Sequence, residues 1–338
     1  SRDVSRSVTN LNGSFVSKTV KGAKYWYFQY TDISGDVRQI YVGPESAAVT
    51  ELVERSSREA RKSLAEPIER LARSAIALGN AAIIPRHLRV IRRLAEYGFF
   101  RAGGVLIGTH AFLAYGNMFG VAWSAADRTQ DVGFAHAGKN VALALPANIE
   151  VDAHAAVDSL KMGFIPLADV AAKSGGGYVV PKDPDFRLDF VTTLHRGGKE
   201  PYEHPKLKLT LQPLKFMELS LEDITQGALL ADSGAILVNL PDPARFALHK
   251  MIVAPERPRA FATKARKDLE QAAALIEMLR DRRPADLDAV WADLISRGPG
   301  WRGRARDGLA ALDKVAPDLE VKGVFQFRSA AKARTKVK

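Results

Sequence analysis

The sequence contains no cysteine and no segment suited to a membrane. Without a thiol, a disulfide framework, a cysteine-based zinc site and a cysteine nucleophile are all excluded, which fits a reducing compartment. No apolar run approaches the roughly 20 residues of a membrane-spanning helix, and the first residues lack the apolar segment of a signal peptide. The chain begins at Ser1 rather than at a methionine, which indicates a trimmed or altered N-terminus. We therefore expect a cytoplasmic protein without a membrane partner.

Acidic residues are scarce relative to basic ones. The 338 residues include 49 Lys and Arg against 38 Asp and Glu, so the formal net charge is +11. Such an excess favours a polyanionic partner, with nucleic acid ahead of a membrane surface, although a protein can be basic without binding either. Hydrophobic residues make up 46% of the chain, which is ordinary for a globular protein with a proper core. The length suggests two or three domains of roughly 100–200 residues each.

Several common catalytic motifs are missing as well. The three glycines at 175–177 are not followed by Gly-Lys-Ser/Thr, so this segment is not a P-loop, and residues 173–177 are predicted to form a flexible loop. No Gly-x-Ser-x-Gly elbow is present. The histidines show no i,i+4 pair that would indicate a zinc helix, and we expect structural or solvated roles for His110, His154, His195 and His204.

The most informative segment is residues 103–135, GGVLIGTHAFLAYGNMFGVAWSAADRTQDVGFA. The pattern predicts a buried strand over 105–107, a turn at Gly108 and Thr109, a helix, a loop, and a second strand that starts at Asp131. A strand that enters a helix through a glycine turn directs backbone N–H groups and the helix dipole toward one point, which favours an anion. A carboxylate at the start of the second strand adds a metal-binding group. The segment therefore indicates phosphate and divalent-cation chemistry, although the turn could also be structural only.

The order of these features, followed by Arg128-Thr129-Gln130-Asp131-Val132, resembles the nucleotidyltransferase fold of the DNA polymerase β superfamily. It is most similar to bacterial nucleotidyltransferases of the abortive-infection and toxin–antitoxin groups, and the resemblance covers roughly residues 99–269. It implies Gly-Ser or Gly-Thr, a later Asp-x-Asp that ligates Mg²⁺ or Mn²⁺, and a third acid that activates the attacking hydroxyl. Position for position, Asp131 is the first acid and metal ligand. Asp189 is the best third acid and second ligand, with Asp185 as a weaker alternative beside two prolines.

The second acid of Asp-x-Asp is missing, because Gly133 stands in its place. A glycine supplies no ligand and weakens a strand. The chain is then either an inactivated copy or an enzyme that works poorly with fewer ligands. His136 could be proposed as a substitute ligand, but three residues further along a strand it should face the other side.

The resemblance also implies a set of nucleotide-binding residues. Gly108 and Thr109 would contact the β- and γ-phosphates, and Arg128 and Thr129 would lead into the acidic strand. Similar proteins carry one lysine on the helix after the sheet and another ahead of an Asp-Leu pair. The matching nucleotide-binding candidates are Gly108, Thr109, Arg128, Lys250, Lys264 and Lys267, and the three lysines could otherwise be ordinary exposed side chains.

Two further segments could bind nucleic acid. Residues 13–43 predict a small antiparallel sheet whose aromatics either stack bases over a basic surface or pack on the following helix. Residues 85–97 predict a basic amphipathic helix. Its arginines either form a solvated face or contact a tRNA or DNA backbone, and the nucleic-acid-binding candidates are Arg86, Arg89, Arg92 and Arg93.

The remaining pattern predicts an α+β protein. We expect a nucleotidyltransferase-fold mixed sheet core, a small N-terminal antiparallel β-sheet and a helical C-terminal region. One long helix, kinked or divided at Pro67, should span 44–79. Apolar and other residues alternate over 186–191, which places Arg187, Asp189 and Val191 on one side of a strand and Phe186, Leu188 and Phe190 on the other. Further strands are expected at 215–219 and within 227–240, and helices at 243–252, 260–280, 285–296 and 302–315. The expected domains are 1–44 (small sheet), 45–98 (helical linker), 99–242 (nucleotidyltransferase core), 243–329 (helical C-terminal domain) and 330–338 (basic tail).

Together these features predict transfer of a nucleotide from an NTP, with Mg²⁺ or Mn²⁺, to an RNA or protein hydroxyl, in a copy impaired by Gly133. The resemblance alone suggests a toxin or phage-defence role and a cognate antitoxin. The alternative is a non-catalytic nucleotide- or nucleic-acid-binding module on the same fold.

Overall fold

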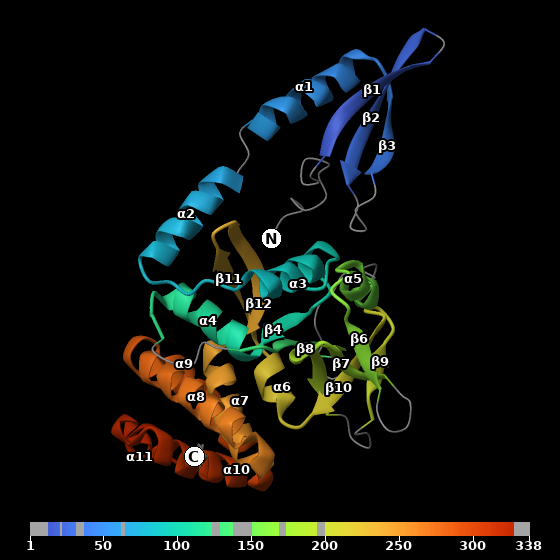
Figure 1. Cartoon of the computed structure of the whole chain (residues 1–338). Coiled ribbons are helices and arrows are strands. Elements are labelled where there is room, and N and C mark those ends of the chain that lie inside the picture. The colour runs from blue at the N-terminus through green and yellow to red at the C-terminus, as the bar shows by residue number, and fades with distance from the viewer. Residues whose placement is uncertain are drawn as a thin grey trace, which may run out of the picture.

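The computed structural model describes residues 13–20, 22–31, 37–61, 65–123, 129–137, 151–168, 174–194 and 200–327. Figure 1 shows a small sheet and a helix that stand apart from a larger body, with a second helix leading into that body. The body combines a mixed sheet with a set of C-terminal helices, which confirms the predicted α+β architecture. Among the described residues, no helix has both the length and the apolar character that crossing a bilayer requires.

The N-terminal part, which we call the N-terminal module, is a three-stranded antiparallel sheet followed by one helix. Its elements are β1 (Gly13–Val20), β2 (Ala23–Thr31), β3 (Val37–Pro44) and α1 (Ala47–Arg61). The strands pair in the order β1-β2-β3, with a bulge in β2 between Trp26 and Tyr27. The predicted small antiparallel sheet is therefore present.

The long helix predicted over 44–79, kinked or divided at Pro67, is divided into two helices, α1 and α2 (Ala65–Ala77). Pro67 lies in the first turn of α2, where its missing N–H would have had no partner within the helix anyway. Helix α2 contacts the hairpin formed by β11 (Ile224–Ala231) and β12 (Gly234–Pro241), and α3 (Pro85–Glu96) follows it.

The body is built on a seven-stranded mixed sheet whose main order is β4-β5-β8-β10-β9, with β7 on β8 and β6 on β7. The strands are β4 (Val105–Ile107), β5 (Val132–Ala135), β6 (Ile165–Ala168), β7 (Ser174–Val180), β8 (Asp183–Thr193), β9 (Tyr202–His204) and β10 (Leu209–Leu214). Strand β8 runs parallel to β5 and β10 and antiparallel to β7. Because β5 and β8 are parallel neighbours, residues far apart in sequence, such as Gly133 and Asp189, lie side by side in the sheet.

Of the glycine-rich segment 173–177, predicted as a loop, residues 174–177 form the start of strand β7, and residue 173 lies outside the described residues. A Cβ at Gly176 would clash with the carbonyl oxygen of Phe190 and lie 2.6 Å from the backbone nitrogen of Gln212. The glycines therefore permit a close backbone approach inside the sheet. The loop prediction failed because a run of glycines occurs both in flexible loops and in strands where two backbones approach closely, and the sequence does not distinguish the two.

A second correction concerns residues 215–219. They were predicted as a strand, but β10 ends at Leu214 and a short helix, α6 (Met217–Leu221), follows. Phe216 adopts a left-handed conformation with φ 64° that ends the strand and starts the helix. Short apolar runs do not distinguish strand from buried helix, which explains the error.

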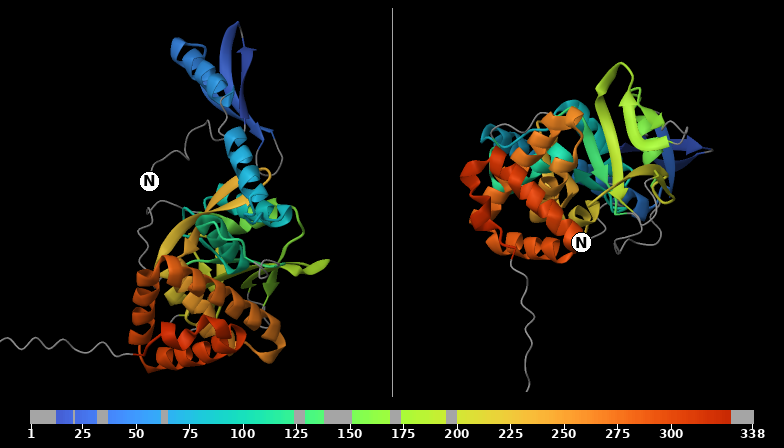
Figure 2. Two further views of the ribbon diagram at one scale, coloured as in Figure 1. Left: turned by 90° about the vertical axis from the view of Figure 1, so that its left-hand side faces the viewer. Right: turned by 90° about the horizontal axis from the view of Figure 1, so that it is seen from below.

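The C-terminal region is helical, as predicted. Asp242 caps α7 (Pro243–Val253) by accepting hydrogen bonds from the backbone N–H groups of Ala244 and Arg245. The helices that follow are α8 (Ala262–Arg282), α9 (Pro284–Ser296), α10 (Pro299–Val315) and α11 (Val321–Val324). Figure 2 shows these helices packed together beneath the sheet. One hydrophobic core extends from α3 and α4 (Gly108–Phe119) through the sheet into α7–α10.

Candidate active site

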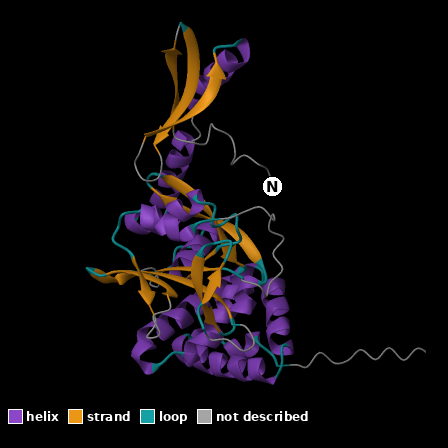
Figure 3. Cartoon of the chain, turned by 90° about the vertical axis from the view of Figure 1, so that its right-hand side faces the viewer, coloured by secondary structure: helices purple, strands orange, loops and turns teal. Residues whose placement is uncertain are grey.

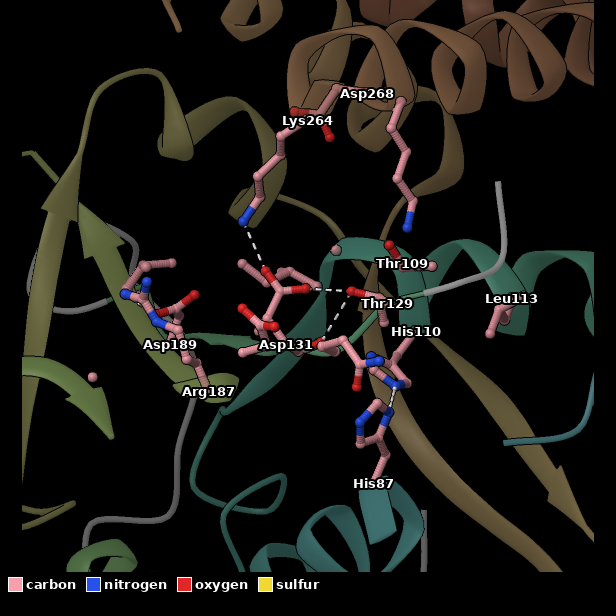
Figure 4. A pocket seen from close by; sticks show the side chains of 18 of the residues that line it. His87, Thr109, His110, Leu113, Thr129, Asp131, Arg187, Asp189, Lys264 and Asp268 are labelled. Carbon is pink, nitrogen blue, oxygen red and sulfur yellow. Dashed lines mark hydrogen bonds and ion pairs between the residues drawn. The ribbon is translucent and has the colours of Figure 1, made fainter. Parts of the chain in front are cut away.

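A cavity of about 1310 Å³ opens where the sheet meets α4, α7 and α8. Its walls come from the start of α4, the start of β5, one face of β8, the residues before α3 and the polar side of α8. Figure 4 shows these side chains converging from separate elements. The cavity collects Gly108, Thr109, Asp131, Gly133, Asp189, Lys250, Lys264 and Lys267, which the sequence had singled out.

Strand β4 passes directly into α4 at Gly108, and this junction lines the cavity. Gly108 has φ +69°, a left-handed conformation that an L side chain rarely adopts, so the sharp change of direction depends on glycine. No side chain caps the first turn of the helix. The hydroxyl of Thr109 accepts a hydrogen bond from the Gln271 amide at 3.4 Å. Uncapped N–H groups of a 12-residue helix at the wall of a cavity are suited to an anion.

Asp131 lies just before β5, and two neighbouring side chains hold its carboxylate. Its Oδ2 atom is 2.7 Å from the Lys264 ammonium, and its Oδ1 atom accepts a short hydrogen bond from the Thr129 hydroxyl (Figure 4). Burial works to raise the pKa of Asp131, but the Lys264 charge and the hydrogen bonds from Lys264 and Thr129 outweigh it. The pKa therefore lies well below its ordinary value, and Asp131 is ionised at neutral pH.

Asp189 shares the cavity with Asp131 but has the opposite electrostatic character. Burial raises its pKa above the ordinary value, and the nearby charge of Asp131 adds to this, while Arg187 and Lys264 oppose it. Arg187 reaches Asp189 at 3.8 Å. The predicted alternation of β8 is confirmed, because Phe186, Leu188 and Phe190 are buried in the core. The other face of the strand, with Asp185, Arg187, Asp189 and Val191, lines the cavity.

Gly133 is the direct neighbour of Asp189 in the parallel pairing of β5 with β8. Both residues line the cavity, as does Asp131 two positions earlier. Residue 133 thus occupies the place from which a second acid would face the other two. A Cβ at this position would lie 3.1 Å from Cγ1 of Ile107, so a larger residue would require a small shift of that side chain.

The three predicted lysines line the cavity but differ in their contacts. Lys250 on α7 is buried and ion-paired with Asp268 at 2.5 Å, and Arg257 contacts the same carboxylate at 2.7 Å. These two cations outweigh the effect of burial and hold the pKa of Asp268 below its ordinary value. Lys264 and Lys267 lie on α8 one turn apart, so they present charge along one side of the cavity.

A pair of buried histidines also lines the cavity, and no sequence signal pointed to it. His87 Nδ1 and His110 Nε2 are 2.9 Å apart (Figure 4). The His87 ring stacks on Phe186. Burial lowers the pKa of His87 to about 4 and that of His110 to about 3, so both are neutral near pH 7. The residues belong to α3 and α4, and only tertiary packing brings them together. His136, weighed as a substitute ligand, bonds the Ala102 carbonyl oxygen at 2.9 Å and is not among the residues lining the cavity.

The remaining predicted residues fall outside the cavity or outside the described chain. Arg128 lies in the segment 124–128, which is not among the described residues. The arginines of α3 all have partners within the protein: Arg86 bonds Asp183 and Gln130, Arg89 the Leu160 carbonyl, Arg92 Ser233, and Arg93 Glu96. Their predicted role in nucleic-acid binding stays a prediction.

Carboxylates are suitable ligands for Mg²⁺, but those of the cavity fit a divalent ion poorly as they stand. Both oxygens of Asp131 are engaged by Lys264 and Thr129, and Gly133 supplies no ligand. Within the described ranges, no three acidic or histidine side chains gather as a metal site would require. The ammonium of Lys264 lies where a cation would contact Asp131.

The chain resembles known proteins to different degrees. No curated protein matches the chain. Among solved structures, an antigenic nucleotidyltransferase-like protein from Paracoccidioides brasiliensis is similar at 13% identity and a TM-score of 0.31, over 67% of this chain and 95% of that one. A family model described as nucleotidyltransferase matches residues 86–296, a range that contains every described residue of the cavity from His87 to Asp268. The chain therefore belongs to this nucleotidyltransferase family.

Proposed function

We propose that this cavity transfers a nucleotidyl group from an NTP to a hydroxyl of RNA, with tRNA as the first choice, or of a protein. The observation that carries the proposal is the meeting of an uncapped helix start, two acids of opposite pKa shift and two lysines of α8 in one cavity. Each part matches a requirement of the reaction, in which the protein mainly positions the triphosphate and neutralises charge.

The triphosphate is proposed to lie between the start of α4 and the lysines of α8. Gly108 and Thr109 offer backbone N–H groups and a hydroxyl from one side, and Lys264 and Lys267 offer ammonium groups from the other. Lys250 would act at longer range, since its charge is already matched by Asp268. Arg128 remains part of this proposal from its position ahead of Asp131.

The acids are proposed to divide the chemistry. Asp189, whose raised pKa makes it the better proton acceptor, would take the proton of the attacking hydroxyl. The hydroxyl oxygen then bonds the α-phosphorus, the bond to the β-phosphate oxygen breaks, and pyrophosphate leaves toward the lysines. Asp131, ionised and held by Lys264, would fix the position of that lysine until the triphosphate competes for it.

The proposed cofactor is Mg²⁺ or Mn²⁺, with Asp131 and Asp189 as the acids that would hold it. Because the site fits such an ion poorly in this chain, we assign no step of the reaction to it. Because Gly133 stands in the position of the second acid of Asp-x-Asp, we infer an impaired enzyme.

The same observation supports a second candidate, a non-catalytic nucleotide- or nucleic-acid-binding module. Lys264 neutralises Asp131 from within the chain, so the cavity could accept a nucleotide without needing a metal. The affinity for NTP separates the candidates, because an enzyme binds the NTP–Mg²⁺ complex more tightly than NTP alone, whereas a pure binding module does not.

Wider context belongs to the proposal as well. We infer from the sequence resemblance a bacterial protein of the DNA polymerase β superfamily, related to abortive-infection and toxin–antitoxin nucleotidyltransferases and acting in the cytoplasm, with an antitoxin as a further partner. The five-part domain division at residues 44, 98, 242 and 329 is part of the same proposal.

Isothermal titration of the full chain with each NTP, with and without Mg²⁺, tests the proposal. Transfer is followed with labelled NTPs and total cellular RNA or protein as acceptors. Asp131→Asn is the test variant, since it keeps the size of the side chain and removes the charge that Lys264 contacts. Its affinity for NTP should therefore differ from that of the wild type. An unchanged affinity, or no binding of any NTP to the wild type, would contradict the proposed site.

A further inference from the structure

The sheet of the N-terminal module has one covered and one uncovered face. On the covered face, the rings of Phe15 and Phe28 lie 5.1 Å apart, and Phe28 is 2% exposed. Helix α1 packs on this side, since a Cβ at Gly43 would lie 3.5 Å from Val49 of α1. Cross-strand partners share a face, so Phe15 and Phe28 lie on the same side of the sheet. The next residues along each strand, such as Val16 and Tyr27, lie on the opposite side.

Three tyrosines cluster on the opposite face. Tyr41 contacts Tyr25 and Tyr27, with ring centroids 6.3 and 5.5 Å apart. The side chain of Tyr41 is 55% exposed. Figures 1 and 3 show the sheet standing away from the body. Large planar side chains are thus held together at the surface without serving the core.

Polar groups of matching chemistry surround these rings. The Lys18 ammonium lies 4.9 Å from the centroid of Tyr27 and donates a hydrogen bond to Gln39 Oε1 at 2.6 Å. Gln39 in turn donates to Gln29 Oε1 at 2.7 Å. The described strand residues on this face include one cation, Lys18, and no carboxylate. We call the set Lys18, Tyr25, Tyr27, Gln29, Gln39 and Tyr41 the tyrosine face.

We propose that the tyrosine face binds single-stranded nucleic acid. Exposed aromatic rings stack on bases whatever their sequence, because every base has a flat face. A lysine at the rings can contact a phosphate, and side-chain amides can bond base edges. The net charge of +11 favours a polyanion over a protein partner that has few acidic residues. An RNA held here would be a natural acceptor for the proposed transfer, so the inference deepens the proposed function while depending on different residues.

Binding is measured on the full chain, without NTP, by the fluorescence anisotropy of short labelled oligouridine and oligoadenine RNAs and of DNA of the same sequences. Single-stranded probes should bind at low salt and a duplex should bind more weakly. Tyr41→Ala and Tyr27→Ala should each weaken binding about 10-fold, as loss of one stacked base does. Tyr41→Phe, which keeps the ring, should retain the affinity.

A charge-matched pair separates this site from general electrostatics. Lys18→Gln removes a cation from the tyrosine face. Lys24→Gln removes one from the same sheet, where the lysine pairs with Glu45 at 2.7 Å and lies over the Trp26 ring. Lys18→Gln should weaken binding more than Lys24→Gln. Hydrogen exchange of residues 13–61 reports whether the module stays folded in each variant.

Three results would overturn the inference: no binding to any single strand at low salt, alanine variants that are folded and bind like the wild type, or equal effects of Lys18→Gln and Lys24→Gln, which would assign the binding to overall charge. Tyr41→Ala should bind NTP as the wild type does, because Tyr41 is not among the residues that line the cavity. Failure of the proposed NTP site and failure of this surface can therefore be told apart.

Discussion

In the body, the rings of Phe99, Phe134 and Phe190 pack against one another and have no solvent exposure. In the N-terminal module, Phe28 is the only buried aromatic side chain among the described residues. The body also encloses charges, such as Lys250 and Asp268, while the module leaves tyrosines at its surface. Charged groups inside and large aromatics outside are both departures from the usual distribution. In each region the departure marks the place where we propose a ligand binds.

The physical reason for the contrast is size. The body has one continuous core from α3 to α11, large enough to enclose an ion pair and a cavity. The module, with three strands and one helix, can cover only one face of its sheet. The predictions below either break this contrast or sharpen it.

The largest effect is expected from Gly133→Asp. The new carboxylate would face the cavity beside Asp189 and two residues from Asp131, completing a metal site. Mg²⁺-dependent NTP affinity and transfer should rise together, with the rate increasing by orders of magnitude, because a bound metal contributes several kcal/mol to such transition states. Without metal, repulsion among the acids should lower stability slightly.

Gly133→Ala is the matched control for this variant. It carries the same steric demand on Ile107 but brings no carboxylate, so it should show the small loss of stability without any gain in Mg²⁺ response. If Gly133→Asp folds and still gains neither metal-dependent binding nor transfer, the reading of an impaired enzyme loses its support and the binding module replaces it.

The second effect concerns the enclosed charges of the body. Asp268→Asn leaves the buried Lys250 ammonium and the Arg257 guanidinium without their common carboxylate. The free energy of unfolding should fall by about 3–5 kcal/mol, the usual loss when one partner of a buried ion pair is removed. Denaturant titration measures the change. Glu270→Gln, which breaks the exposed pair with Arg266 at 2.9 Å, should change stability by less than about 1 kcal/mol. Equal effects of the two variants would contradict the burial of the Lys250–Asp268 pair.

The third effect is a loss of stability in mild acid. His87, His110 and His249 have pKa values lowered by burial to about 4, about 3 and about 4, against an ordinary 6.5. As pH falls below 6.5, the unfolded chain takes up protons that the folded protein does not. Unfolding should therefore become easier by about 1.4 kcal/mol per pH unit for each such group between pH 6.5 and 4.

The acids act in the same sense but at lower pH. The pKa values of Asp131 and Asp268 are lowered by their cations, so their contribution is lost only as pH falls below the ordinary range of aspartate. Melting temperatures from pH 7 to 4 measure the histidine effect. A variant with His87→Phe and His110→Leu should show a shallower decline, and an unchanged slope would mean that these rings are protonated in the folded state.

The smallest effect on the body is expected from a change in the module. Phe28→Ala removes the centre of the module's core and should unfold β1–β3 locally. The main unfolding transition of the body should stay within about 0.5 kcal/mol, because surfaces without shared partners act additively. Hydrogen exchange of residues 13–61 in increasing denaturant follows the module, and far-ultraviolet circular dichroism follows the whole chain. A parallel shift of both transitions would show that the two regions fold as one unit.

Local pattern was sufficient for much of the fold and part of the site. The strand–glycine–helix junction at Gly108, the alternation of β8 around Asp189 and the helix expected at 243–252 depend on neighbours in sequence, and each was predicted and is present. The family, too, could be inferred from a short ordered set of residues, and residues 86–296 match it.

Tertiary structure alone decided the rest. The strand conformation of Gly176 follows from the backbones of β8 and β10, and the His87–His110 pair follows from the packing of α3 against α4. The partners of Lys264 and Lys250 were likewise hidden, because the Lys264–Asp131 ion pair joins positions 133 residues apart. Periodicity reports which face of a helix or strand is buried, whereas which charges and rings meet across elements depends on how those elements pack.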